Sequence, residues 1–67
     1  MDIGDIFNCI IVSKAILGYI VRLPDNSTGL MIYTNYNGRI YPPYEGETFK
    51  CCVVRKINKF IDLKNVK

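Results

Sequence analysis

Residues 17–35 read LGYIVRLPDNSTGLMIYTN, and this stretch decides the fold class. Two apolar runs flank a polar turn, PDNST, at residues 24–28. β-Branched and aromatic residues in the runs favour strands, whereas proline, aspartate and asparagine favour tight turns. The stretch is therefore predicted to form a β-hairpin, with strands at about 18–24 and 28–34.

Three further segments outside this hairpin have the same apolar, strand-like character. They lie at residues 5–13, 47–56 and 59–64, and turn residues separate them at short intervals. No stretch sustains the apolar spacing of an amphipathic helix, so an all-β fold is expected. Five short strands in 67 residues predict a closed barrel, because closure removes exposed strand edges. We expect a five-stranded OB-fold barrel forming one domain over residues 1–67, with an SH3-like barrel as the competing architecture.

Period-two alternation within the predicted strands indicates which side chains point together. The sets that share a face are Tyr19, Val21 and Leu23 in the second segment, Phe49, Cys51 and Val53 in the fourth, and Ile61 and Leu63 in the fifth. Ile61 and Leu63 are expected to point inward, with Phe60 and Asp62 outward.

Charge is unevenly distributed along the chain, whose formal net charge is +3. From Lys50 onward six basic residues accompany one acid, whereas the first 49 residues carry three basic residues and five acids. A basic C-terminal third favours an anionic partner, such as RNA or an acidic protein surface. The same lysines and arginines would also serve as a merely solvated face.

The three cysteines, Cys9, Cys51 and Cys52, form a poor disulfide framework, because their number is odd and two are adjacent. Adjacent strand residues face opposite ways, and the chain has no histidine, so no metal site is expected. Reduced, partly buried thiols in a cytoplasmic protein are predicted. The acidic start of the chain and the shortness of its apolar runs predict neither a signal peptide nor a membrane span.

Catalysis has little support in the sequence. Without histidine, a nucleophile–histidine pair cannot form. The neighbouring acids Asp2 and Asp5, and Glu45 and Glu47, precede predicted strands, where acids commonly serve as turn residues. We expect no enzyme and no cofactor.

Six short motifs follow one another along the chain. They are GDIFNCIIV at 4–12, LGYIVRL at 17–23, TGLMIYT at 28–34, YEGE at 44–47, FKCCVVRK at 49–56 and FIDL at 60–63. In this order they resemble the S1-type RNA-binding domain, a form of the OB-fold. The resemblance implies a binding face on the second and third strands, and we expect the loop at residues 35–45 and the basic C-terminal third to contribute to it. It also implies single-stranded or structured RNA, the ribosome or translation factors as partners.

Aromatic and basic side chains on and near that face are the candidate RNA-binding residues, because bases stack on rings and phosphates attract cations. The set is Lys14, Tyr19, Arg22, Tyr33, Tyr36, Arg39, Arg55, Lys56 and Lys59. Tyr19 has a second interpretation, since its parity with Val21 and Leu23 also fits a core residue with its hydroxyl at the surface.

Three positions depart from the S1 pattern and favour an alternative, a protein-binding mimic. Aromatic or histidine positions of RNA-binding members correspond here to Leu17, Ile20 and Ile32. The end of the chain, residues 51–67, also resembles the S1-like N-terminal domain of the alpha subunit of eukaryotic initiation factor two. Short poxviral mimics of that domain are pseudosubstrates of the kinase that phosphorylates the factor. This resemblance implies a host protein such as a kinase as partner, bound through Leu17, Ile20, Ile32, Phe60 and Asp62.

Overall fold

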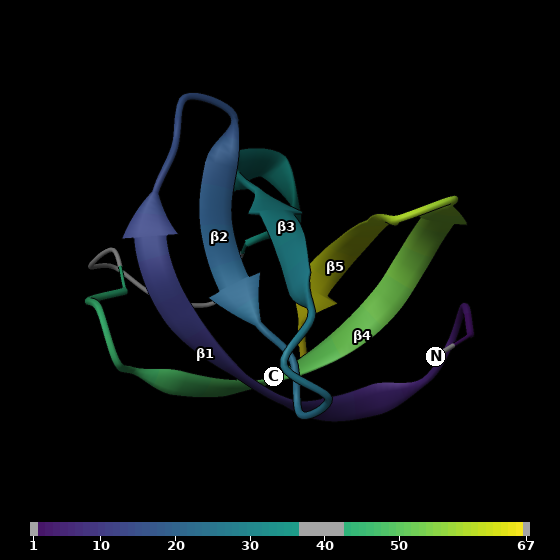
Figure 1. Cartoon of the computed structure of the whole chain (residues 1–67). Coiled ribbons are helices and arrows are strands. Elements are labelled where there is room, and N and C mark those ends of the chain that lie inside the picture. Colours follow the sequence, from purple (N-terminus) through teal and green to yellow (C-terminus); the bar gives the residue numbers. More distant parts are fainter. Residues whose placement is uncertain (1, 37–42, 67) are drawn as a thin grey trace.

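Five strands and one short helical turn make up the computed structural model, which describes residues 2–36 and 43–66 (Figure 1). The elements are β1 (Ile6–Lys14), β2 (Gly18–Arg22), β3 (Thr28–Ile32), the 3₁₀ turn η1 (Tyr33–Asn35), β4 (Thr48–Ile57) and β5 (Phe60–Asn65). Among these residues no helix has the length and apolar character needed to cross a membrane.

The strands close into a barrel in the order β1-β2-β3-β5-β4, with β4 pairing back onto β1. All neighbours are antiparallel except β3 and β5, which run parallel and pair through Leu30 and Asp62. The expected all-β, five-stranded OB-type barrel is confirmed. The third strand ends two residues earlier than predicted, at Ile32, because Tyr36 donates its backbone N–H to the Tyr33 carbonyl and closes η1.

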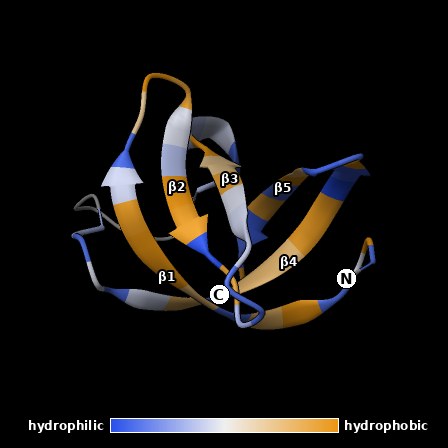
Figure 2. Ribbon diagram, in the orientation of Figure 1, coloured by the Kyte–Doolittle hydropathy of each residue, from blue (hydrophilic) through white to orange (hydrophobic). Residues whose placement is uncertain are grey.

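Alternate residues of every strand fill one core inside the barrel. The buried apolar side chains are Cys9, Ile11, Tyr19, Val21, Leu23, Met31, Cys51, Val53, Ile61 and Leu63. The inward residues expected from alternation in the second, fourth and fifth segments are in this core or pack against it. The ribbon accordingly changes between hydrophobic and hydrophilic along single strands (Figure 2).

One expectation about the cysteines is wrong. Cys9 on β1 and Cys51 on β4 are joined by a disulfide, with their Cα atoms 6.3 Å apart, whereas Cys52 is free. Cys51 lies opposite Phe7, and Cys9 lies opposite Phe49, so both cysteines point into the core from adjacent strands. Because the two cysteines are 42 residues apart in the sequence, their proximity in the barrel could not be predicted from it.

Candidate nucleic-acid interface

One row of side chains crosses four strands on the outside of the barrel. Ile20 on β2 is registered with Leu30 on β3, and Leu30 with Asp62 on β5. Asp62 in turn lies opposite Arg55 on β4. Strands lie about 4.8 Å apart, so the row passes from aliphatic to charged side chains over roughly 14 Å.

A β-bulge on β4 brings Arg55 to this outer face. Val53 pairs with Leu63, whereas Arg55 pairs with Asp62, so β4 contains one extra residue at this point. Unbroken alternation would turn Arg55 inward together with Cys51 and Val53. The bulge instead places its Nε atom 4.0 Å from Oδ2 of Asp62.

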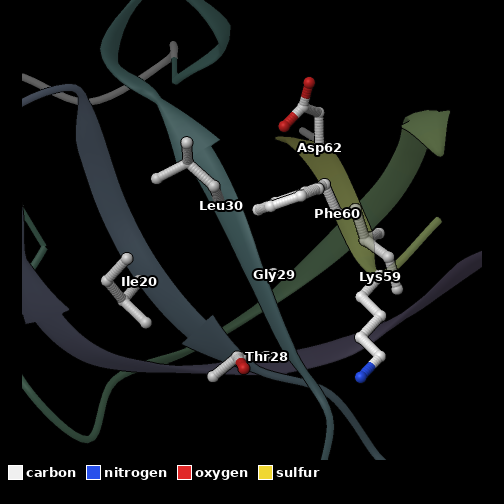
Figure 3. A pocket seen from close by; sticks show the side chains of 8 residues that line it. Ile20, Thr28, Gly29, Leu30, Lys59, Phe60 and Asp62 are labelled. Carbon is white, nitrogen blue, oxygen red and sulfur yellow. The ribbon is translucent and has the colours of Figure 1, made fainter. Parts of the chain in front are cut away.

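Beside this row lies a hollow of about 360 Å³, here called the outer groove. Its lining residues are Ile20, Thr28, Gly29, Leu30, Lys59, Phe60, Ile61 and Asp62. Figure 3 shows the Phe60 side chain reaching from β5 toward Leu30 on β3. Phe60 is 75% exposed and contributes nothing to the core, so its ring is available to a ligand.

One cationic side chain lines the outer groove and others lie on neighbouring parts of the surface. Lys59 lines it from the β4–β5 turn, where Asn58 adopts the left-handed conformation (φ 55°) that a tight hairpin requires. Arg22 is exposed at the end of β2, in register with Thr28 of the groove. Lys56 lies opposite the inward-facing Ile61 and lines a neighbouring hollow with Asp25 and Ser27. Positive charge therefore gathers at the β4–β5 hairpin, which extends away from β1 and β2 in Figure 1.

The predicted tyrosines form a separate cluster at the other end of β2 and β3. Tyr19 makes edge-to-face contacts with Tyr33 and Tyr36, at centroid distances of 5.1 and 5.6 Å, and Tyr36 makes one with Phe49. Tyr19 is only 6% exposed, so it is a core residue whose ring faces are unavailable for stacking. Lys14 lies over Tyr33, with its Nζ 5.9 Å from the ring centroid.

The β1–β2 turn presents a second apolar surface, which is hydrophobic at the top of Figure 2. Ile16 is 93% exposed and Leu17 is 69% exposed. Tyr33 holds this turn in place: its hydroxyl donates to the Ala15 carbonyl, and its backbone N–H donates to the Leu17 carbonyl at 3.1 Å. The turn is thus a fixed feature of the surface.

The structure divides the sequence-predicted residues between these two ends. The outer groove and its rim contain Arg22, Arg55 and Lys59 together with Ile20, Phe60 and Asp62. The opposite end contains Lys14, Leu17, Tyr33 and Tyr36, together with Ile32, which pairs with Gly18. The Arg22–Thr28 pair and the Gly18–Ile32 pair mark the two ends, about 13 Å apart along β2, and the Ile20–Leu30 pair lies between them. Arg39 lies outside the described residues.

Sequence reasoning missed Leu30 and Thr28, which line the outer groove. Both alternate with the inward-facing Gly29 and Met31, so the period-two pattern of β3 would have identified them as outward-facing. In the part of the chain that the structure describes, no three cysteine, aspartate or glutamate side chains gather as metal ligands would.

Comparisons with known proteins add evidence on the fold. No protein-family model and no curated protein matches the chain. A solved structure of an uncharacterised protein from Methanocaldococcus jannaschii superposes with a TM-score of 0.84 at 14% identity, over 98% of this chain and 93% of that one. A multidomain protein with nucleic acid binding domains from Streptococcus pneumoniae gives a TM-score of 0.77 at 19% identity, over 97% of this chain. This chain spans 23% of that protein's length. At such identities the likeness concerns the fold.

Proposed function

We propose that this protein binds single-stranded RNA through the outer groove and its cationic rim, as a non-catalytic S1-type module that acts on RNA or the translation machinery. The single observation that carries the proposal is the outer groove itself. There an exposed aromatic ring, two aliphatic side chains and the cations Arg22, Arg55 and Lys59 lie on one surface. A ring offers stacking to any base, and cations neutralise the phosphates on either side.

The fold and the motif order support the same proposal. OB barrels use the outer face of strands two and three for oligonucleotides, and the Streptococcus pneumoniae neighbour is described as having nucleic acid binding domains. The face differs from the S1 pattern in being aliphatic at Leu17, Ile20 and Ile32. The ring therefore comes from β5, and the β4–β5 hairpin becomes part of the proposed interface.

Fluorescence anisotropy with a short unstructured RNA tests the proposal. Binding should weaken with salt, by about 0.7 log units per log unit of salt for each phosphate contact on a single strand. Arg22→Ala and Lys59→Ala should each weaken binding and make the salt dependence shallower by roughly that amount. Lys50→Ala is the charge-matched control, because Lys50 faces outward beside Asn8 of β1, away from the outer groove.

Two results would contradict the proposal. The first is the absence of RNA binding at low salt by the well-folded protein. The second is an equal loss of affinity in all three variants, which would indicate attraction by net charge without an interface. Circular dichroism of each variant establishes that the barrel is intact.

A second candidate function, the protein-binding mimic, is favoured by a different observation. The β1–β2 turn exposes Ile16 and Leu17 and is fixed by Tyr33, and apolar side chains continue along the outside of β2 and β3. Such a surface suits a protein partner better than a polyanion. In its sharpest form the partner is the kinase that phosphorylates the alpha subunit of initiation factor two.

A binding assay with the purified kinase tests this candidate. Leu17→Asp should abolish binding, because it places a charge on the apolar turn without altering a buried side chain. Inhibition of phosphorylation of the initiation factor should be lost in parallel. Undiminished inhibition by Leu17→Asp, or no binding by the unaltered protein, would exclude the turn as the docking surface.

A further inference from the structure

We propose that the outer groove is a subsite for one nucleobase that carries an exocyclic amino group, stacked on Phe60 and held by Asp62. This inference rests on the proposed RNA-binding function and adds to it a base preference and a location on β5. It follows from the size of the groove and from the order of side chains along β5. It adds side chains of β5 to the aliphatic face of β2 and β3.

The shape and lining of the outer groove fit one flat ring. Its volume of about 360 Å³ is at the lower end of the range typical of small-ligand sites. Leu30 and Ile20 form one side, and the ring of Phe60 extends from the other toward Leu30 (Figure 3). The tip of the ring points toward Leu30, so a base in the groove stacks on a face of Phe60 and covers apolar surface that is otherwise exposed to water.

Charged groups lie on both sides of the Phe60 ring. Lys59 precedes it in the β4–β5 turn and Asp62 follows it on β5, and Figure 3 shows their side chains on opposite sides of the ring. A nucleotide has the matching asymmetry, with a polar base edge at one end and an anionic phosphate at the other. Lys59 therefore faces the phosphate, and Asp62 faces the base edge.

Asp62 determines which base edge is accepted. An ionised carboxylate only accepts hydrogen bonds, and it has more acceptor positions than its contact with Arg55 occupies. The amino group of cytosine donates to such a carboxylate, whereas uracil presents a carbonyl oxygen at the same position. Cytosine and uracil are equal in size, so the carboxylate alone distinguishes them.

A side chain of a partner protein in the outer groove would interact with fewer of its lining residues than a nucleotide would. An aliphatic or aromatic residue of a partner protein would fill the space between Phe60 and Leu30, but would use neither Lys59 nor Asp62. A nucleotide engages the apolar side chains, the cation and the carboxylate together.

The test compares short oligocytidylate and oligouridylate of equal length in the anisotropy assay. The unaltered protein should bind the cytidylate at least about five-fold more tightly. Phe60→Ala and Phe60→Leu should each weaken cytidylate binding about ten-fold, while Phe60→Trp should retain it, because stacking requires a ring. Phe60 is largely exposed, so these variants leave the core intact.

Asp62→Asn isolates the carboxylate, because an amide both donates and accepts and so loses the preference between the two bases. Arg55→Ala is compared with it: the loss of a rim cation should weaken binding of both oligomers alike, but the carboxylate of Asp62 remains, so the cytidylate preference should persist.

The outcomes distinguish failure of the base subsite from failure of the proposed RNA binding. Equal binding of the two oligomers, an unchanged Phe60→Leu variant, or a cytidylate preference retained by Asp62→Asn would overturn this inference while the proposed RNA binding remains. Failure of the folded protein to bind either oligomer would overturn both and would favour a protein partner.

Discussion

At Gly18 the barrel leaves no room for a side chain. A β-carbon on this residue would lie 2.3 Å from the carbonyl oxygen of Met31 and 2.5 Å from the Cα of Ile32, both on the neighbouring β3. These are backbone atoms, which move only if the strand pairing moves. The glycine in LGYIVRL is therefore required by strand packing, independently of any ligand.

We predict that Gly18→Ala destabilises the protein by at least about 3 kcal/mol, the upper part of the range for overpacking. Gly29→Ala is the comparison, since its β-carbon would meet the terminal methyl of Leu63 at 2.8 Å, and a side chain can move. It should cost less, about 1–2 kcal/mol. Urea denaturation of the variants measures both, and equal losses would contradict the backbone argument.

Tyr19 shows how far a single residue can be interpreted from sequence. Its type suggests stacking on a ligand, and its alternation with Val21 and Leu23 suggests the core. The structure buries it at 6% exposure and surrounds its ring with Tyr33 and Tyr36. Alternation was the better guide here, because strand geometry is strictly periodic, whereas tyrosine is common both in cores and at interfaces.

At the level of elements, the turn between β2 and β3 is organised by Asp25. Its Oδ1 accepts hydrogen bonds from the hydroxyl and the backbone N–H of Ser27, the latter at 3.0 Å. Both bonds favour the ionised carboxylate, the hydroxyl bond most, and hold the pKa of Asp25 below its ordinary value of 3.8. Asn26 supports the turn by adopting a left-handed conformation, with φ 68°.

We predict that Ser27→Ala raises the pKa of Asp25 toward 3.8 in a carboxylate titration followed by NMR. A depressed folded-state pKa stabilises the protein above the unfolded value, and the stabilisation is lost as the pH falls through the folded-state pKa. The stability difference between the two proteins that arises from this carboxylate should therefore shrink below about pH 3.8. Ser13→Ala, on β1, serves as the control. An unaltered Asp25 titration in Ser27→Ala would contradict the assignment.

Sequence alternation did not reveal the β4 bulge, nor the register shift between Ile11 and Ser13 on β1. The residues from Phe49 to Val53 follow simple parity, and nothing in CCVVRK marks the extra residue that reverses the parity at Arg55. Bulges depend on how neighbouring strands twist around a barrel, which is a property of the assembled sheet. The Arg55–Asp62 contact could therefore not be predicted from residue order.

For the whole molecule, the disulfide between Cys9 and Cys51 joins two strands 42 residues apart in sequence. Closing a loop of this length restricts the unfolded chain, and we predict that reduction destabilises the protein by about 2–4 kcal/mol. Denaturation with and without reductant measures the effect. Cys9→Ala with Cys51→Ala should abolish the response to reductant, and Cys52→Ala should leave it unchanged. Alkylation of all three cysteines in the folded, unreduced protein would exclude the bond.

The sequence by itself determined the five strands, their approximate ends and the side chains of the second, fourth and fifth strands that enter the core. It could do so because turn residues and period-two alternation are local properties of the chain. The tertiary structure alone decided that Cys9 meets Cys51, that Arg55 turns outward to Asp62, and that Phe60, Leu30 and Ile20 line one groove beside Lys59. These arrangements depend on the parallel pairing of β3 with β5 and on barrel closure, which bring together residues that no local pattern relates.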